Sequence, residues 1–323
     1  MPTAALVATE LILSKRLLAL TPLSAKRPKS NFVLVTFDAL NAEDMSLYGR
    51  AFLTTPNIDA FARKGTVFTN FYSASDFTNP CVASILTAAY PSDHHIYQMK
   101  GQLRSRYSES NLTHAMRSAG FATGAVYSNP YAYYFARTLE NKFDILPEPV
   151  FQQGGLQQLW NATTLPHQHS GIGSRMDEYL DLIGVWNYLG RLPDNLAERF
   201  RAAASFDLAR QVMARLPEGF FLWVHVMTPH GPYLPDVADL GRFSDPNTDI
   251  YRLKGAVSWK PHYALNLQSK VDVHRRRYDE FIATADRAFG AFMSDLENTG
   301  KLQNTTIIVS ADHGESFRHC TRI

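Results

Sequence analysis

The most constraining feature of the sequence is a pair of apolar runs, one near each end of the chain, that each lead into a carboxylate. The first run, NFVLVTF, ends at Asp38, and the second, TTIIV, is followed closely by Asp312, His313 and Gly314. Uninterrupted apolar runs of this kind are typical of strands in a parallel sheet that is covered on both faces. Gly314 allows the backbone to turn, so an adjacent carboxylate and imidazole can reach one divalent cation. The pattern predicts a metal site at two strand ends.

Between these runs, helix-like and strand-like segments alternate along the chain. Helices are expected from Pro56, from Thr78, in LTHAMRSAG, and over 277–296, where apolar residues recur at helical spacing. Strands are expected at TVFTNFY (66–72), FATGAVYSN and GFFLWVHVM. Strands that alternate with helices predict an α/β domain with a mainly parallel sheet sandwiched by helices.

Reactive side chains fall where the strands of such a sheet would end, which is where open α/β sheets bind ligands. They are Asp38, Thr78, His230, and the pair Asp312 and His313. A single one of these motifs would be weak evidence, but four segments that converge on one edge predict a functional site.

Thr78 stands at the start of an expected helix, with Pro80 in the first turn. Threonine is a common helix N-cap, and this is one interpretation of the residue. The other interpretation is catalytic. Free backbone N–H groups at a helix start can hold an anion, and a metal that touches the hydroxyl lowers its pKa, so an alkoxide becomes available near neutral pH.

Composition limits the possible classes of protein. The chain has 323 residues, of which 45% are hydrophobic and 19% charged, and its net charge of +2 gives no sign of nucleic-acid binding. The basic run at 274–277 is interpreted as a solvated helix face. Two cysteines, Cys81 and Cys320, do not make a disulfide framework. Residues 1–30 are expected to be a leader or linker, because this stretch is too charged for a membrane span and is not a convincing signal peptide.

Several motifs, in their order along the chain, resemble the sulfatase branch of the alkaline phosphatase superfamily. They are FDALNAEDMSLYG, TPNIDAFARKGTVFTNFYSASDFTNPCVASILTAAYPSDH, HVMTPHGPYLP and YDEFIATADRAFGAFMSDLENTGKLQNTTIIVSADHGE. The resemblance spans 31–315 and implies an alkaline phosphatase/sulfatase-like fold. It also implies a hydrolase or transferase in which a metal-bound nucleophile attacks the sulfur or phosphorus of a sulfate or phosphate ester, and a covalent intermediate is then resolved.

Carried over by position, the resemblance implies a role for each candidate residue. Asp38, Asp312 and His313 would bind one divalent metal, Thr78 would be both the nucleophile and a metal ligand, and His230 would contact the oxygens of the transferred group. The alternative for His230 is a loop histidine packed by the neighbouring prolines. An imidazole ligand favours Zn²⁺ or Mn²⁺ over Ca²⁺, which prefers all-oxygen shells, although Ca²⁺ stays open.

Two departures from the sulfatase pattern narrow the chemistry. The sequence TNPCV, which begins at Thr78, stands where sulfatases carry Cys-x-Pro-x-Arg, so threonine replaces the residue converted to formylglycine and Val82 replaces the arginine. The first strand also ends on one aspartate and not on two. This set is similar to that of lipoteichoic acid synthases and phosphoethanolamine transferases, which use Mn²⁺ or Zn²⁺ on membrane substrates. The implied partner is an anionic ester, with lipid-linked and glycan-linked forms and membrane association all open.

The chain ends soon after the Asp-His-Gly triplet, whereas members of the family continue with further strands. Residues 31–323 are therefore expected to form a truncated N-terminal catalytic domain, and a fragment, a frameshifted reading frame and a degenerate protein all remain open. An irregular stretch at 152–197 is expected to be an insertion over the sheet edge, and His319 is a weak match to a later family histidine. The alternative function is a catalytically inactive metal- or anion-binding domain. By resemblance, a periplasmic or membrane-surface location is possible, and the compartment stays unknown.

Overall fold

The computed structural model describes residues 30–97, 101, 103–107, 109–137, 143–147, 201–248, 250 and 265–317. The expectations for the leader, for the stretch at 152–197, for Cys320 and for His319 lie outside these residues. In the described part of the chain, no helix combines the length and the apolar composition that a bilayer crossing requires.

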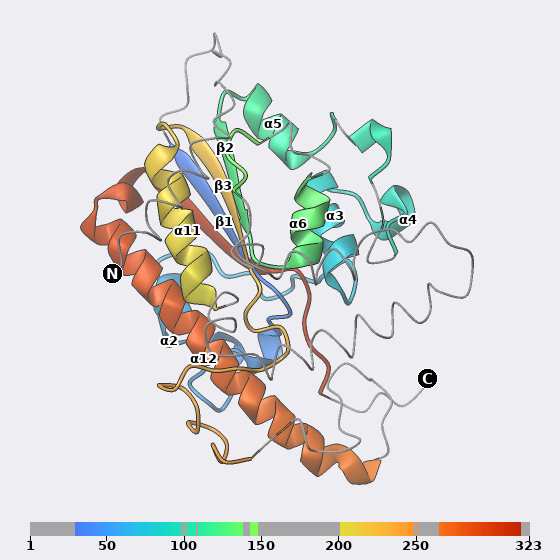
Figure 1. Cartoon of the computed structure of the whole chain (residues 1–323), viewed down its shortest axis with the longest axis vertical. Helices are drawn as coiled ribbons and strands as arrows, with labels where there is room; N and C mark the ends of the chain where they lie inside the picture. The colour runs from blue at the N-terminus through green and yellow to red at the C-terminus, as the bar shows by residue number, and fades with distance from the viewer. Residues whose placement is uncertain are drawn as a thin grey trace, which may run out of the picture.

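The sheet is parallel throughout, as the sequence predicts (Figure 1). Its strands are β1 (Asn31–Phe37), β2 (Ala122–Tyr127), β3 (Phe220–Val226) and β4 (Thr305–Ala311). They pair in the order β2-β3-β1-β4, so the first and last described strands lie side by side, with Phe37 opposite Ala311. This pairing brings the residues that follow β1 and β4 to one edge of the sheet.

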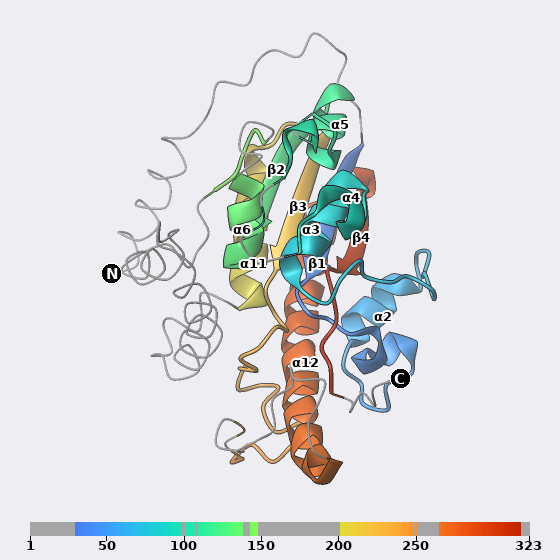
Figure 2. The same ribbon diagram turned by 90° about the vertical axis from the view of Figure 1, so that its right-hand side faces the viewer.

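Helices cover both faces of the sheet, which confirms the predicted α/β sandwich (Figures 1 and 2). One face is covered by α2 (Pro56–Ala62), α11 (Ala202–Arg215) and α12 (Gln268–Asn298). The other face is covered by α3 (Thr78–Thr87), α4 (Pro91–His94), α5 (Leu112–Ser118) and α6 (Pro130–Arg137). Short 3-10 turns are η1 (Ala42–Asp44), η2 (Ser46–Tyr48), η3 (Ser105–Tyr107), η9 (Leu265–Leu267) and η10 (Lys301–Asn304).

Two apolar cores follow from the alternation of side chains along β1. Val33 and Val35 face α11 and α12, whereas Leu34 faces the side of α3, because successive side chains of a strand point to opposite faces. At the end of β1 that leads to the site, Phe37 packs edge-on against Phe206 and Phe289, with ring centroids 6.3 and 6.4 Å away. The strand end is thus set in a rigid aromatic cluster.

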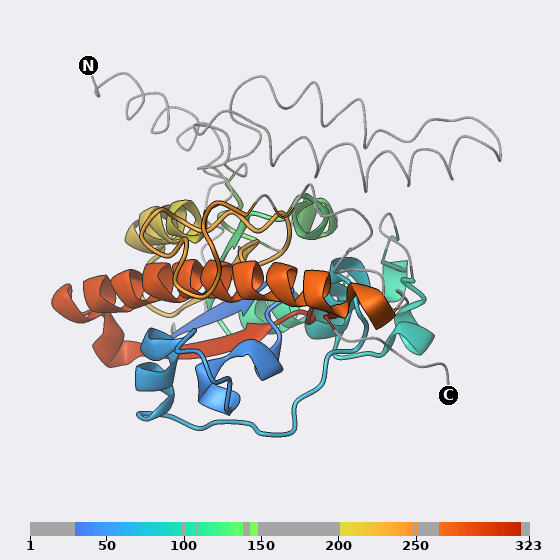
Figure 3. The same ribbon diagram turned by 90° about the horizontal axis from the view of Figure 1, so that it is seen from below.

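The turn after β1 is held by α12, the long helix that runs lengthwise in Figure 3. Ala39 has a φ of 59°, a left-handed conformation that strains a residue other than glycine. The buried Tyr278 of α12 donates its hydroxyl to the Ala39 carbonyl at 2.5 Å and accepts from the Asn41 N–H at 2.9 Å. These two bonds hold the strained turn, and with it the orientation of Asp38.

The loop after β3 is anchored to the same helix. Glu280 accepts from the backbone N–H groups of Phe243 and Ser244 at 2.9 and 2.7 Å, and Thr284 accepts from the N–H of Asp236 at 3.0 Å. Because loops need partners for their backbone N–H groups, these side chains replace the missing strand or helix bonds. The single helix α12 therefore supports two of the loops at the site edge.

The expectation of a strand at 66–72 is wrong. This segment has no strand structure, and Phe68, Phe71 and Tyr72 are 67%, 70% and 83% exposed. A strand needs a neighbour that accepts its backbone hydrogen bonds, and none of the four described strands pairs with this segment. The β-branched and aromatic residues of this segment are therefore not sufficient to form a strand.

The interpretation of 274–277 as a solvated face is also wrong for most of the run. His274 and Arg277 are each 8% exposed, and Arg277 pairs with Glu280 at 3.0 Å. Arg275 donates to Asp44 of η1 at 2.6 Å. Arg277 thus pairs within its own helix, whereas Arg275 pairs with an acidic group of a neighbouring segment, and the pattern of one helix does not reveal the second kind of partner.

A pair of tyrosine variants tests the support of the first turn. Tyr278→Phe is expected to destabilise the protein by about 1–3 kcal/mol, because it leaves the buried Ala39 carbonyl without its donor. Tyr127→Phe is the matched control, since Tyr127 is also buried but its hydroxyl has no hydrogen-bond partner among the described residues. Urea unfolding of both variants measures the difference, and equal losses would contradict the role of Tyr278.

Candidate metal centre

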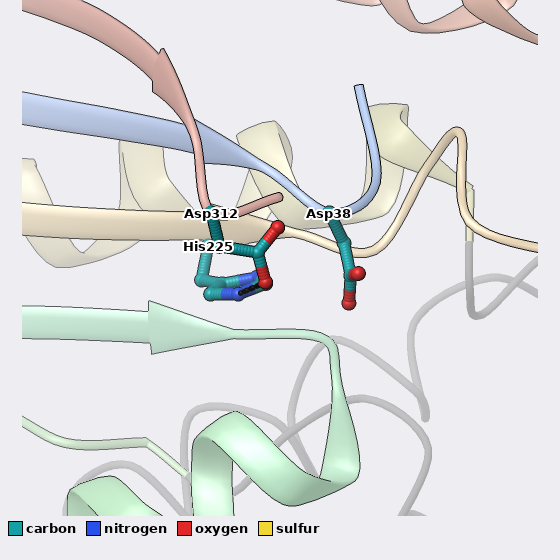
Figure 4. Close-up of side chains that lie close together, drawn as sticks. All are labelled: Asp38, His225 and Asp312. Atoms are coloured by element: carbon teal, nitrogen blue, oxygen red, sulfur yellow. Dashed lines mark ion pairs between the residues drawn. The ribbon is translucent and has the colours of Figure 1, made fainter. Parts of the chain in front are cut away.

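Two carboxylates from different strands meet at the edge of the sheet. Asp38 follows β1 and Asp312 follows β4, and they are 0% and 2% exposed (Figure 4). The N–H of Asp38 donates to the Val226 carbonyl at 2.8 Å, and the N–H of Asp312 donates to the Phe37 carbonyl at 3.3 Å. The backbone bonds of the sheet thus continue past the strand ends and fix the position of both residues.

Each carboxylate uses one oxygen within the protein and leaves the other unused. Oδ1 of Asp312 accepts from the N–H groups of Ala39 and His313 at 3.1 and 2.7 Å, and Oδ2 of Asp38 accepts from the side-chain amide of Asn129. The second oxygens, Asp312 Oδ2 and Asp38 Oδ1, are buried and have no hydrogen bond within the described ranges. A buried carboxylate oxygen without a donor costs free energy, and a bound cation removes that cost.

His313 presents one ring nitrogen to these unused oxygens. Its Nδ1 donates to the Gly314 carbonyl at 2.8 Å, because a carbonyl can only accept. Its Nε2 lies 3.3 Å from Asp38 Oδ1 and 3.8 Å from Asp312 Oδ2. A histidine whose Nδ1–H is held by a backbone carbonyl has the orientation typical of a metal ligand.

Thr78 brings a hydroxyl to the same place from α3. It is 6% exposed, its Oγ1 lies 3.4 Å from His313 Nε2, and the Asn129 amide donates to it at 3.5 Å. The interpretation of Thr78 as the N-cap is wrong, since Phe77 occupies that position and no side chain caps the helix. The Thr78 hydroxyl therefore lies beside His313 and Asn129 and does not cap the helix.

The distances between these atoms fit one small ion. Ligands that bind a tetrahedral zinc at about 2.0–2.2 Å lie roughly 3.3–3.6 Å apart. The separations of His313 Nε2 from Asp38 Oδ1 and from Thr78 Oγ1 are 3.3 and 3.4 Å, and that from Asp312 Oδ2 is 3.8 Å. Two of these separations fall in that range and the third is slightly longer, so the side chains present fit a divalent metal in chemistry and approximately in spacing.

His230 reaches the same edge from the loop after β3. Its ring lies edge-on to that of His313, with centroids 6.3 Å apart, and its Nδ1 donates to the Gly231 carbonyl at 2.7 Å. All five residues expected from the sequence are thus brought to one region of the protein.

Asn129 is a site residue that the sequence reasoning missed. It precedes α6, where its Oδ1 accepts from the N–H groups of Tyr131 and Ala132 at 2.7 and 3.2 Å. This capping fixes the amide, whose nitrogen donates to both Asp38 and Thr78. An asparagine followed by proline directly after a strand is a helix-start signal that could have pointed to it.

His225 of β3 is the second residue that was missed. It is fully buried, its Nε2 lies 3.3 Å from Asp312 Oδ2, and ligand atoms of Asp38, His225 and Asp312 all lie within 4.8 Å of one another (Figure 4). These three residues could hold a metal ion. The available signal was one polar residue inside the apolar run FFLWVHV.

Electrostatics couple the acidic and imidazole groups. Burial disfavours the imidazolium, but Asp312 and then Asp38 outweigh it and raise the pKa of His313 to about 10. Burial also opposes ionisation of Asp38, yet the histidines His230, His313 and His225 hold the pKa of this carboxyl below its usual range. Without a metal, a proton on His313 therefore balances part of the carboxylate charge.

Cys81 is poorly suited to act as a thiolate. Burial, and secondarily the charge of Asp312, raises the pKa of its thiol to about 12, and its Sγ donates to the Ser75 carbonyl at 3.2 Å. Such a thiol is almost fully protonated at neutral pH, so it is a weak nucleophile.

A parallel α/β sandwich with carboxylates, imidazoles and a hydroxyl at its carboxyl edge matches the ester-cleaving enzymes of the alkaline phosphatase superfamily. The family model called Sulfatase matches residues 30–321, and the chain belongs to the sulfatase family. This confirms the resemblance drawn from the motifs.

Individual relatives are distant. The chain is 24% identical to the N-acetylgalactosamine-6-sulfatase of Rattus norvegicus over 325 residues, which are 93% of this chain and 53% of the relative. It is also 24% identical to the endo-4-O-sulfatase of Bacteroides thetaiotaomicron, over 81% of this chain and 52% of the relative. The chain thus spans about half the length of these curated relatives.

Among solved structures, the phosphonate monoester hydrolase of Agrobacterium radiobacter shares the fold, with a TM-score of 0.60 at 18% identity. The match covers 90% of this chain and 64% of the hydrolase.

The raised pKa of His313 makes the stability of the metal-free protein depend on pH. The folded state binds this proton up to about pH 10, whereas an unfolded histidine loses it near 6.5. The stabilisation is fully present below pH 6.5 and is lost as the pH rises towards 10. The melting temperature of chelator-treated protein should fall over this window, and less steeply for His313→Gln. Parallel profiles for the two proteins would contradict the assignment.

Proposed function

We propose that this chain is a metal-dependent hydrolase or transferase that acts on sulfate or phosphate esters through a covalent Thr78 intermediate. The observation that carries the proposal is the convergence of Thr78 Oγ1, His313 Nε2 and the two unused carboxylate oxygens at one edge of the sheet. Family membership supports ester cleavage as the reaction class.

The residues that would hold the metal are Asp38, Thr78, Asp312 and His313. When bound, a divalent ion would supply positive charge that lowers the pKa of the Thr78 hydroxyl and offsets charge on the ester oxygens. A mixed oxygen and nitrogen set favours Zn²⁺ or Mn²⁺ over Ca²⁺. The structure of the C-terminal periplasmic domain of EcEptC from Escherichia coli, in complex with Zn, supports zinc. The match to that structure covers 91% of this chain and 66% of that domain, with a TM-score of 0.52 at 19% identity.

The chain's own residues have distinct tasks in the reaction. Thr78 Oγ1 loses its proton and bonds to sulfur or phosphorus, while the bond to the leaving alcohol breaks and that alcohol takes up a proton. Asn129, which donates to both Thr78 and Asp38, keeps the nucleophile beside the ligand set. His230 would contact oxygens of the transferred group. Water or an acceptor alcohol then releases the group from Thr78.

The substrate is proposed to be an anionic ester. Two observations favour different esters, one a sulfate ester and the other a phosphate ester. The curated relatives are by name sulfatases, including an ulvan-active sulfatase of Formosa agariphila, which favours sulfated glycans. Threonine at position 78, in the place of the residue converted to formylglycine, favours phosphoryl transfer of the kind found in lipoteichoic acid synthases and phosphoethanolamine transferases. Residues 31–323 are proposed to belong to one catalytic domain.

Metal analysis tests the proposed ligand set. The purified protein is expected to hold about one equivalent of a divalent transition metal per chain, and Asp312→Ala should lose it, because that variant removes the ligand oxygen. Asp207→Ala is the matched control, since Asp207 lies on α11 with 57% of its side chain exposed. A protein that stays metal-free after incubation with Zn²⁺ and Mn²⁺ would exclude this site.

Substitution of Thr78 tests the nucleophile. Thr78→Ala should lower kcat by about 10³-fold or more without loss of the fold, and Thr78→Ser should retain part of the activity because a hydroxyl remains. Thr87→Ala is the control in the same helix, where the hydroxyl only donates to the Ala83 carbonyl at 2.7 Å. Rates on aryl sulfates, phosphate monoesters and phosphate diesters provide the measurement.

The outcomes separate the possible functions. Wild-type rates in Thr78→Ala would remove Thr78 from the mechanism, and formylglycine at Cys81 in mass spectrometry would favour the sulfatase chemistry instead. Metal binding without turnover on any of the three esters would favour the alternative, an inactive metal- or anion-binding domain.

A further inference from the structure

The ligand set proposed above contains one imidazole, that of His313. We propose that His225 binds the same ion through Nε2, so that β3 contributes a ligand beside those that follow β1 and β4. This inference rests on the metal dependence in the proposed function and adds a ligand to those that the resemblance implies.

The spacing of His225 is that of a neighbouring ligand. Its Nε2 lies 3.3 Å from Asp312 Oδ2, which equals the separation of His313 Nε2 from Asp38 Oδ1. Asp312 Oδ2 thus has an imidazole nitrogen at 3.3 Å and another at 3.8 Å. The ligand atoms of His225, Asp38 and Asp312 form a group within 4.8 Å.

The hydrogen bonds around His225 favour a ligand over a packed core residue. The ring is 0% exposed, and neither Nδ1 nor Nε2 has a hydrogen-bond partner in the described ranges. By contrast, His94, which is 1% exposed, has Ser84 Oγ at 3.0 Å from Nε2 and the Ile96 N–H at 3.1 Å from Nδ1. A buried imidazole without a hydrogen-bond partner costs free energy, and a metal at Nε2 would offset that cost.

The missing hydrogen bond between His225 and Asp312 distinguishes a ligand from a simple donor. Although the distance from Nε2 to Asp312 Oδ2 is in the hydrogen-bond range, the two atoms form no hydrogen bond. Two neighbouring groups that bind one ion each point at the ion and not at each other. A short distance without a hydrogen bond is what this arrangement produces.

A second imidazole changes which ions the site selects. Two carboxylates and two imidazoles suit borderline transition metals such as Zn²⁺ and Co²⁺, whereas Mg²⁺ and Ca²⁺ prefer oxygen ligands throughout. The centre is therefore expected to take Zn²⁺ or Co²⁺ in strong preference to Ca²⁺.

Cobalt binding to the full chain tests the inference without any need for turnover. Titration with Co²⁺ gives the Kd by competition with a chelator, and the visible absorption of the bound ion reports its ligands. His225→Leu is expected to raise the Kd by about tenfold or more and to change the absorption bands. It should keep or raise the stability of the metal-free protein, because it removes a buried polar ring without partners. Tyr127→Phe is the control, since Tyr127 is paired with His225 in the sheet and its ring lies 6.0 Å away.

Each result has a definite meaning. Equal Kd values and spectra for wild type and His225→Leu, with binding lost in Asp312→Ala, would overturn the role of His225 and leave the proposed function intact. A lower melting temperature with an unchanged Kd would overturn it in favour of a packing role. If the leucine variant fails to fold, His225→Gln gives the same comparison. If wild type binds neither Co²⁺ nor Zn²⁺, the metal dependence itself fails, and this inference fails with it.

Discussion

The parallel pairing of β1 with β4 is the constraint on which the site depends. It joins residues at opposite ends of the described chain and places the residue after Phe37 beside the residue after Ala311. Parallel strands have their carboxyl ends at the same edge of the sheet. The strand ends themselves therefore place Asp38 beside Asp312. The free energy that brings two negative charges together comes from the apolar sheet below them, in which β2 and β3 are fully buried and β1 is almost fully buried, while β4 is partly exposed.

The helix α12 acts as the frame for the loops at this edge. Its inner face covers the sheet with apolar residues such as Phe289, while Tyr278, Glu280 and Thr284 hold the backbone of the loops after β1 and β3. One element therefore performs both packing and positioning. This dual role explains why charged residues of α12 are buried, although a helix pattern with isolated charges is usually taken to be solvated.

The sequence predicted the parts of the structure that depend on local pattern. The apolar runs gave β1, β2, β3 and β4, and the ligand candidates were the polar residues just after two of them. The sequence wrongly predicted a strand at 66–72, because strand formation depends on a neighbouring strand as well as on the segment itself. His225 and Asn129 were missed for a related reason. A histidine inside an apolar run and an asparagine before a helix gain a site role only when strands and helices distant in sequence bring them to Asp312 and Asp38.

The balance of charge at the edge of the sheet explains how the same side chains could serve the site with and without a metal. Two buried carboxylates need compensation, and the raised pKa of His313 shows that a proton provides part of it when the metal is absent. A divalent ion brings more positive charge than that proton and can displace it, since Nε2 of His313 cannot hold both. Under the proposed function, metal binding would exchange a proton for an ion at a preformed cluster. The backbone bonds to Asp312 Oδ1, which do not involve Nε2, can remain in place during that exchange.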